Sequence, residues 1–370
     1  MALLLDETLL AARLLDHIDR GETDLGERCW REPVANYRSA ERLEAELKLA
    51  FQVTPTAFCP SAALAKPGSY LARNAGGASI LAVRGADGVA RAFRNACRHR
   101  GAEVARGSGE AKAFTCPYHA WTYGLDGALR GVPHEHGFPG LDKSCNGLVP
   151  LQTSERGGLV FVTQSPGAAV ADSEPITFIG PDMRLISTTE QVTAANWKIL
   201  AEGFLEGYHI MPTHRETFYP VQFDNLNVIE QFGRDSRVTF PYRNIEKLRG
   251  VEPSQRRVGG VLTFVYHLFP NVIIATFPKR TVMAVLEPDG IDRTRTINYV
   301  LAHERDLRDE PDAVQAATDF VNAGANEDRA VVESIQRGMA SGANEAFQFG
   351  LYEAAIVHFH QNLHELVGEA

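Results

Sequence analysis

Hydrophobic and polar positions alternate over short runs from Phe51 to about Ser165, a pattern typical of β-strands. The runs SYLARN, SILAVRG, ARAFRNA and GLVFVTQ are separated by glycine- or proline-containing turns. The Asp87-Gly88 pair predicts a hairpin whose second strand ends near Asn95. We therefore expect a small all-β domain over residues 51–165.

The remainder of the chain predicts helices and a second set of strands. Leucine and alanine recur at helical spacing over residues 1–50, which we expect to form a helical segment that packs on the C-terminal domain. A Gly-, Ala- and Pro-containing connector over residues 166–181 marks a domain boundary at residue 166. The domain over residues 166–370 should contain a helix over about 194–211, strands between Val228 and His303, and helices over about 312–338 and 344–367. This order predicts an α+β fold in which helices cover one face of an antiparallel sheet.

Neither of two apolar segments has the pattern of a membrane anchor or leader. The uncharged run from Val258 to Pro278 contains a Pro270-Asn271 break and β-branched residues, which predict two buried strands joined by a turn. The N-terminal run lacks a basic region and contains Asp6 and Glu7, so we expect an amphipathic helix there.

Composition narrows the function classes. The 370 residues are 44% hydrophobic and 22% charged, as in globular proteins, and the net charge of −9 disfavours nucleic-acid or anionic-membrane partners. Five cysteines, three of them scattered as Cys29, Cys59 and Cys145, do not suggest a disulfide framework. A reducing cytoplasm is the expected location.

The candidate chemistry begins with two short ligand motifs, Cys97-x-His99 and Cys116-x-x-His119. Two thiolates and two imidazoles can hold either a tetrahedral zinc or a two-iron cluster with histidines on one iron. The flanking sequences AFRNACRHRG and CPYHAWTYGLDGALRG resemble the Rieske [2Fe–2S] domain. The resemblance implies that Cys97 and Cys116 bind one iron and that His99 and His119 bind the other.

A second constellation lies in the segment NWKILAEGFLEGYHIMPTH, residues 196–214. On a helix reaching about Met211, Glu202, Glu206 and His209 would share one face. His214 follows just after the helix, so two imidazoles can meet on one ion. With one carboxylate they would form the facial triad of non-haem Fe(II) enzymes, which leaves positions open for O₂ and substrate.

The carboxylate is expected far downstream, in NEDRAVVESIQRGM. Asp328 falls on an apolar helical stripe with Val332 and Met339, where a carboxylate needs a partner or a metal. Glu327 falls on a more solvated face and is the alternative, as a solvated neighbour or as an acid that supports a ligand.

These three segments together resemble the terminal oxygenase (α) component of the Rieske non-haem iron oxygenases. The resemblance implies a [2Fe–2S] domain over 51–165 and a catalytic domain over 166–370 whose mononuclear iron is bound by His209, His214 and Asp328. It also implies a homotrimer or an α3β3 assembly, in which Glu206 bridges cluster and iron between subunits. O₂ would be the co-substrate. The reaction would be ring-hydroxylating dioxygenation or monooxygenation of a small organic molecule, in the first place an aromatic one.

One departure bears on the substrate. Most relatives carry aspartate where this chain has Glu206, and carnitine monooxygenase-like members resemble it in having glutamate. Their trimethylammonium substrates, cleaved after C–H hydroxylation, are the alternative to an aromatic one. Such cations favour an aromatic cage, for which the expected candidates are Phe218, Tyr219, Tyr242, Phe264 and Tyr266.

The electron source must be another protein. The chain has no G-x-G-x-x-G dinucleotide motif and no plant-type ferredoxin cysteine spacing. We therefore expect a separate NAD(P)H-dependent reductase, with or without a ferredoxin. The rival hypothesis, an electron carrier or metal-stabilised binding module, predicts no mononuclear iron. His134, His136, His358, His360 and His364 are expected to be structural or exposed.

Overall fold

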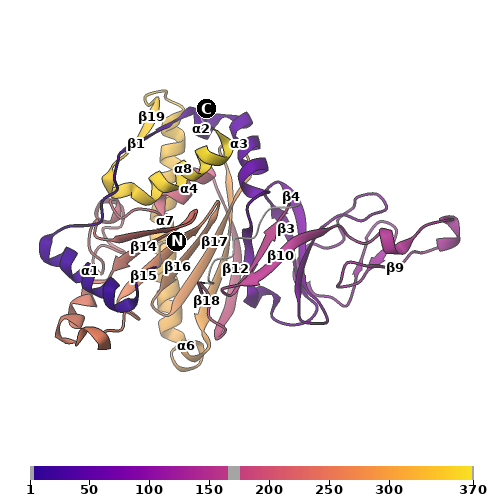
Figure 1. Ribbon diagram of the computed structural model, residues 1–370, viewed down its shortest axis with the longest axis horizontal. Helices are drawn as coiled ribbons and strands as arrows, with labels where there is room; N and C mark the ends of the chain where they lie inside the picture. The colour runs from indigo at the N-terminus through magenta and orange to yellow at the C-terminus, as the bar shows by residue number, and fades with distance from the viewer. Residues whose placement is uncertain (1–3, 166–175, 369–370) are drawn as a thin grey trace. The chain divides into compact units, whose positions relative to one another are not determined.

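The computed structural model describes residues 4–165 and 176–368, and its contacts divide the chain into two compact units (Figure 1). Residues 51–181 form one unit, and residues 1–50 with 182–370 form the other. The predicted α+β class is confirmed, with a small all-β unit and an antiparallel sheet that carries helices. Residues 166–175 of the predicted connector lie outside the described residues.

The unit of residues 51–181 is built from short antiparallel strands and 3-10 turns. Its described strands are β2 (Thr56–Pro60), β3 (Ser69–Ala75), β4 (Ala78–Arg84), β5 (Ala90–Arg94), β6 (Gly107–Glu110), β7 (Phe114–Thr115), β8 (Thr122–Tyr123), β9 (Leu129–Gly131), β10 (Pro150–Arg156) and β11 (Leu159–Thr163). They form a sheet in the order β2-β11-β10-β5-β4-β3-β6 and a small sheet β7-β8-β9. The predicted hairpin at Asp87-Gly88 joins β4 to β5, and Gly88 adopts a φ of 80° that glycine permits.

The other unit is centred on a long antiparallel sheet (Figure 1). Its strands are β12 (Met183–Thr193), β13 (Val228–Phe232), β14 (Asp235–Pro241), β15 (Leu262–Leu268), β16 (Val272–Phe277), β17 (Arg280–Pro288) and β18 (Thr294–His303), in the order β12-β18-β17-β16-β15-β14-β13. The uncharged run from Val258 to Pro278 supplies β15 and β16, joined at Pro270-Asn271 as predicted. In the described part of the chain, no helix is long and apolar enough to cross a membrane.

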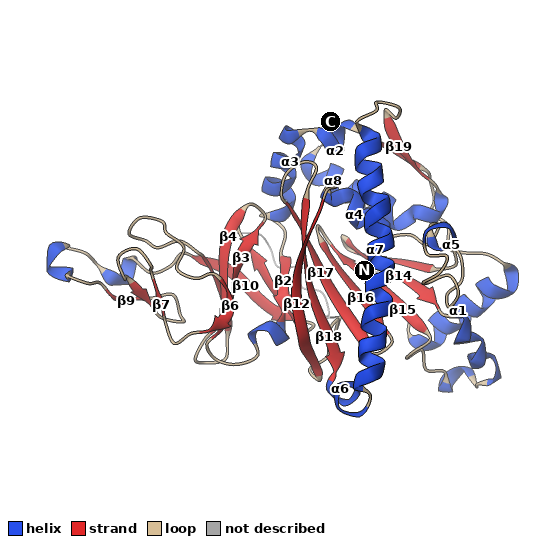
Figure 2. Cartoon of the chain, turned by 180° about the vertical axis from the view of Figure 1, so that it is seen from behind, coloured by secondary structure: helices blue, strands red, loops and turns tan. Residues whose placement is uncertain are grey.

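Helices cover this sheet. They are α1 (Glu7–Arg20), α2 (Ala35–Arg38), α3 (Ala40–Glu46), α4 (Trp197–Gly203), α5 (Ile210–Thr213), α6 (Glu304–Asp309), α7 (Pro311–Met339) and α8 (Ala354–Val367). Helix α7 begins at a proline, which the first helical turn tolerates, and crosses one sheet face (Figure 2). Helix α1 buries Leu10 and Leu14 against Ile245 and Leu248, so the N-terminal segment packs on this unit.

Two predicted helical segments are partly extended instead. Residues 1–50 are not helical throughout, because strand β1 (Trp30–Pro33) separates α1 from α2. The predicted helix over residues 344–367 begins only at Ala354, because β19 (Ala346–Phe349) pairs with β1. Long-range pairing between the two ends of the chain overrides local propensity in both segments.

The helix predicted over residues 194–211 is also interrupted. Helix α4 ends at Gly203, and the short α5 begins at Ile210. Gly203 and Gly207 have low helix propensity, and a Cβ at Gly207 would lie 3.0 Å from the Phe240 ring. The prediction that Glu202, Glu206 and His209 share a helix face is therefore wrong, and the break turns Glu206 and His209 toward each other.

Candidate metal centres

Three of the predicted ligand residues converge at the C-terminal half of α7. One ligand atom each of His209, His214 and Asp328 lies within 4.8 Å of the others. The Asp328 carboxylate is 2.9 Å from His214 Nε2 and 3.6 Å from His209 Nε2. Because both imidazoles present Nε2 and the aspartate presents Oδ1, the donor set fits a facial triad.

Each imidazole is held by a carboxylate on its other ring nitrogen. Glu206 Oε1 contacts His209 Nδ1, and Glu327 Oε2 lies 2.8 Å from His214 Nδ1. Thr217 donates a second hydrogen bond to Glu327, at 2.6 Å. Such partners fix the orientation of a metal-bound imidazole. Of the two alternatives left open for Glu327, the contact supports the acid that orients a ligand.

Neighbouring carboxylates favour a positive charge at His209. Burial opposes protonation of His209, but the hydrogen bond and charge of Glu206 outweigh it and raise the pKa of His209. His214 is 1% exposed. A buried imidazole surrounded by carboxylates is a favourable place for a divalent cation.

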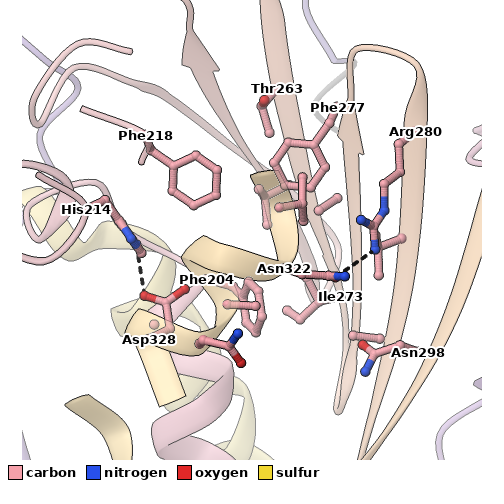
Figure 3. A pocket seen from close by; sticks show the side chains of 18 of the residues that line it. Phe204, His214, Phe218, Thr263, Ile273, Phe277, Arg280, Asn298, Asn322 and Asp328 are labelled. Carbon is pink, nitrogen blue, oxygen red and sulfur yellow. Dashed lines mark hydrogen bonds and ion pairs between the residues drawn. The ribbon is translucent and has the colours of Figure 1, made fainter. Parts of the chain in front are cut away.

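The triad lies at one end of a cavity of about 400 Å³ between α7 and the sheet. Alternate sheet residues line it, as the period of two in a strand requires. Figure 3 shows the His214–Asp328 pair at one end, Arg280 and Asn322 at the other, and the rings of Phe204, Phe218 and Phe277 among the lining.

The aromatic lining differs from the expected cage. Of the five predicted cage residues, only Phe218 lines the cavity, together with Phe204, Phe240 and Phe277. The centroid of the Phe218 ring lies 4.7 Å from that of the His214 ring and 6.2 Å from that of Phe277, on which it stacks. Sequence reasoning missed the other phenylalanines because strand register decides which aromatic residues face the cavity.

Arg280 was also missed. Its place after a Pro-Lys pair at the start of β17 carries no signal in the sequence, and its importance appears only from its burial beside α7. Asn298 on β18 and Gln222 line the same cavity and were missed for the same reason.

The predicted cluster residues lie in the loops that join β5 to β6 and β7 to β8. Cys97 and Cys116 are buried free thiols, and the rings of His99 and His119 are 4.7 Å apart. Desolvation, then the charges of His99 and Arg100, lower the pKa of His119 and favour the neutral form that binds metals. The Tyr123 hydroxyl lies 3.2 Å from Cys97 Sγ.

The spacing of these donors bears on the choice between zinc and a two-iron cluster. Among the described residues, only the His209–His214–Asp328 group brings three candidate ligand atoms within 4.8 Å of one another. Four ligands of one tetrahedral zinc would lie closer than that. The buried His99 Nδ1 has no hydrogen-bond partner in the described chain, which leaves it available as a ligand. The set therefore fits a two-iron cluster.

Hydrogen bonds and ion pairs link α4, α8 and the N-terminal segment next to the triad. Glu202 accepts a hydrogen bond from Tyr37 at 2.6 Å and lies 2.9 Å from His360 Nε2, while His364 lies 3.0 Å from Glu32. These contacts tie α8 to α4 and to the N-terminal segment. His360 and His364 therefore have structural partners here.

Two family models match different parts of the chain. A family model described as the ring hydroxylating alpha subunit (catalytic domain) matches residues 181–369, and one described as the Rieske [2Fe-2S] domain matches residues 54–145. The chain belongs to the Rieske non-haem iron oxygenases. As a Rieske oxygenase component it is an oxidoreductase that uses O₂, a [2Fe–2S] cluster and a mononuclear iron, and such components work with electron-transfer partners, typically as oligomers.

Individual Rieske oxygenases resemble the chain over most of its length. The carnitine monooxygenase oxygenase subunit of Acinetobacter pittii is 31% identical over 84% of this chain and 86% of its own. The chloroplastic choline monooxygenase of Spinacia oleracea is 27% identical over 80% and 69%.

Two crystal structures show the same fold. A quaternary ammonium Rieske monooxygenase in complex with an inhibitor has a TM-score of 0.79 at 24% identity and 99% coverage of both chains. Naphthalene 1,2-dioxygenase from Rhodococcus sp. bound to indole has a TM-score of 0.75 at 20% identity and 98% coverage of both.

Proposed function

We propose that this Rieske oxygenase component hydroxylates a C–H bond of a small quaternary ammonium compound. The observation that carries the proposal is the convergence of His209, His214 and Asp328 at one end of a phenylalanine-lined cavity. Phenylalanine faces attract organic cations. The named activities of the Acinetobacter and Spinacia relatives support this substrate class over the aromatic one that the sequence first suggested.

The residues of the chain would have distinct roles in this reaction. Cys97, His99, Cys116 and His119 hold the [2Fe–2S] cluster, and the triad holds the iron; when bound, these groups supply electron transfer and O₂ activation. Glu206 and Glu327 keep the two iron-binding imidazoles in one tautomer and orientation. One oxygen atom enters the C–H bond and the other leaves as water, with two electrons and two protons supplied from outside the chain.

Glu206 is proposed to connect His209 to a cluster histidine of a neighbouring copy. Exposed aromatic and apolar side chains adjoin it: Tyr208 is 60% exposed and stacks on Tyr352, and Met211 is 44% exposed. Exposed apolar groups of this kind mark interaction surfaces. They support a homotrimer, or an α3β3 assembly, in which this face meets another subunit.

The electron donor is proposed to be a separate NAD(P)H-dependent reductase, directly or through a ferredoxin. The name of the Acinetobacter relative, an oxygenase subunit, supports a multi-component system. We also propose a cytoplasmic location, because all five cysteines are free thiols.

Metal and product analysis tests the proposal. Reconstituted protein should contain about three irons per chain, two in the cluster and one at the triad. With a cognate reductase, NADH and 4-trimethylammoniobutanoate, it should consume O₂ and release an aldehyde together with an amine. Two irons per chain, or one zinc, would contradict the assignment of the triad.

The same assay tests aromatic dihydroxylation, which the apolar cavity lining favours as a second candidate. A cis-diol formed from naphthalene or indole, with no product from the quaternary ammonium compound, would establish that function instead.

Glu206→Gln tests the proposed link between subunits. The amide keeps the size of the side chain but removes its charge, so both metal sites should fill while product formation falls by about 100-fold. Glu206→Asp should retain part of the rate. Full activity of Glu206→Gln would exclude the proposed link.

A further inference from the structure

The cavity has a second polar end that the metal site does not use. Arg280, at the start of β17, lines it and is only 5% exposed. Its Nη1 donates to the carbonyl oxygen of Thr318 at 2.7 Å, and its Nη2 donates to Asn322 Oδ1 at 3.3 Å. Figure 3 shows this pair across the cavity from His214 and Asp328.

The guanidinium lacks a counter-ion within the part of the chain that the structure describes. No carboxylate oxygen there lies within 4.0 Å of it, and its buried Nε has no hydrogen-bond partner. A guanidinium has five N–H donors, of which these two bonds use two. A buried charge normally has an ionic partner, because desolvation without one is costly.

Neighbouring acids do not take this role. The charge of Asp319 favours the protonated Arg280, but Asp319 is exposed and accepts a hydrogen bond from Gln315. Burial, the larger effect, lowers the pKa of Arg280, yet arginine stays protonated in proteins. The two hydrogen bonds hold the guanidinium against α7, and the remaining donors are available to a ligand.

Because no carboxylate of the described residues pairs with the Arg280 guanidinium at the far end of the metal cavity, we propose that the substrate carries a carboxylate that binds there. This inference rests on the proposed function and narrows its substrate class to zwitterions, with the cationic nitrogen at the metal end and the carboxylate at Arg280. Quaternary amines or amino alcohols that have no carboxylate should therefore bind weakly.

Charge and length agree with this orientation. Glu206, Glu327 and Asp328 place three carboxylates at the metal end, more than the charge of one Fe²⁺ offsets. Asn322, which contacts Arg280, precedes Asp328 by six residues on α7, which is about 9 Å along a helix. A short aliphatic chain between cation and carboxylate spans such a distance.

The test compares ligands that differ only in charge. Binding to the reconstituted oxygenase is measured by calorimetry for 4-trimethylammoniobutanoate, for the alcohol (4-hydroxybutyl)trimethylammonium, and for the uncharged-headgroup analogue 5,5-dimethylhexanoate. We expect both carboxylates to bind, and the alcohol to bind about 30-fold more weakly than the zwitterion.

Variants assign the effect to one side chain. Arg280→Gln should weaken binding of both carboxylates by about 30-fold and leave the alcohol within about two-fold. Arg280→Lys keeps the positive charge but loses the planar guanidinium, so its affinity for the carboxylates should lie between those of the wild type and Arg280→Gln. The same variant tests the anion site if Arg280→Gln does not fold. Lys279→Gln is the matched control, because Lys279 pairs with Asp306 and Glu310 and does not line the cavity, so no change is expected.

Failure of this inference differs from failure of the proposed function. Equal affinity of the alcohol and the zwitterion, or unchanged carboxylate binding in Arg280→Gln, would overturn the anion site whatever the enzyme oxidises. Carboxylate binding that depends on Arg280, without oxidation of any trimethylammonium compound, would keep the anion site and overturn the proposed reaction.

Discussion

The two metal-binding regions are assembled in different ways. The cluster residues all lie between positions 97 and 119, on loops closed by near-neighbour hydrogen bonds from the Cys97 amide to Ala102 and from the Cys116 amide to Trp121. The triad combines His209 from the non-helical segment between α4 and α5, His214 at the end of α5, and Asp328 on α7. The first site therefore depends on local loops, and the second depends on packing between distant elements.

The imidazoles are also presented differently. At the triad, both histidines direct Nε2 to Asp328 and hold a carboxylate on Nδ1. In the cluster loops, the buried Nδ1 of His99 lacks a partner among the described residues. Opposite ring nitrogens are thus available to a metal at His99 and at the triad histidines, because the partner of the second nitrogen decides which one is free. The two sites should respond independently to mutation.

Asp328→Ala should have the largest effect. Loss of the carboxylate ligand should lower iron from about three to about two per chain and abolish product formation, while the cluster spectrum is unchanged. Iron analysis and absorbance spectroscopy measure both. Glu333→Ala is the matched control, because Glu333 lies on the same helix and, among the described residues, accepts a hydrogen bond only from the Ala194 amide. Unchanged iron in Asp328→Ala would show that another side chain supplies the ligand.

Cys116→Ser is the reciprocal experiment. The cluster should be lost with its colour, and product formation with it, but the triad should still bind about one iron per chain. Iron content after anaerobic loading with Fe²⁺ provides the measurement. If the triad also lost its iron, the two sites would not be independent.

Acid should destabilise the catalytic unit through a residue that binds no metal. Burial lowers the pKa of His267 to about 4, although its hydrogen bond to the Pro270 carbonyl opposes the shift. The folded state therefore favours neutral His267, so its stability is fully present above pH 6.5 and is lost as pH falls toward 4. The expected change is about 3 kcal/mol.

His267→Gln removes this titration while it retains a donor for Pro270. Urea unfolding of both proteins between pH 4.5 and 7.5 should show a difference in stability that shrinks as pH falls. A difference that is constant with pH would mean that folding does not lower the pKa of His267.

Glu327→Ala should have the smallest effect of the four changes, because it removes support for a ligand but no ligand. Without the hydrogen bond to His214 Nδ1, iron affinity should fall by about 10- to 100-fold. Competition with a chelator measures it. Glu327→Gln keeps an acceptor for the imidazole and should lose less; equal losses in both variants would indicate that the charge alone matters.

Prediction from sequence succeeded where neighbouring residues carry the signal. The alternation in residues 51–165 and 228–303 predicted both sheets, and the Asp87-Gly88 hairpin follows from its turn residues. The assignment of ligands to the two metal sites stays a prediction. It came from short motifs whose flanks resemble the family, and for Asp328 also from a carboxylate on an apolar stripe, which needs a partner.

The failures lie where distant contacts outweigh local preference. The helix expected through Met211 stops at Gly203, because the packing of Phe240 against Gly207 and the contact between Glu206 and His209 need a different backbone path. Segments expected to be helical became β1 and β19 by pairing with each other. No local pattern records such pairings, since each strand is specified by a partner at the other end of the chain.

Residue type and short spacing were sufficient to predict the family, the two kinds of metal site and the candidate ligands. Three properties follow only from the tertiary structure: the set of aromatic rings that line the cavity, the contact of Glu327 with His214, and the burial of Arg280 beside α7 with no ionic partner among the described residues. Those properties depend on strand register and on how α7 crosses the sheet, and both are set by the packing of the whole unit.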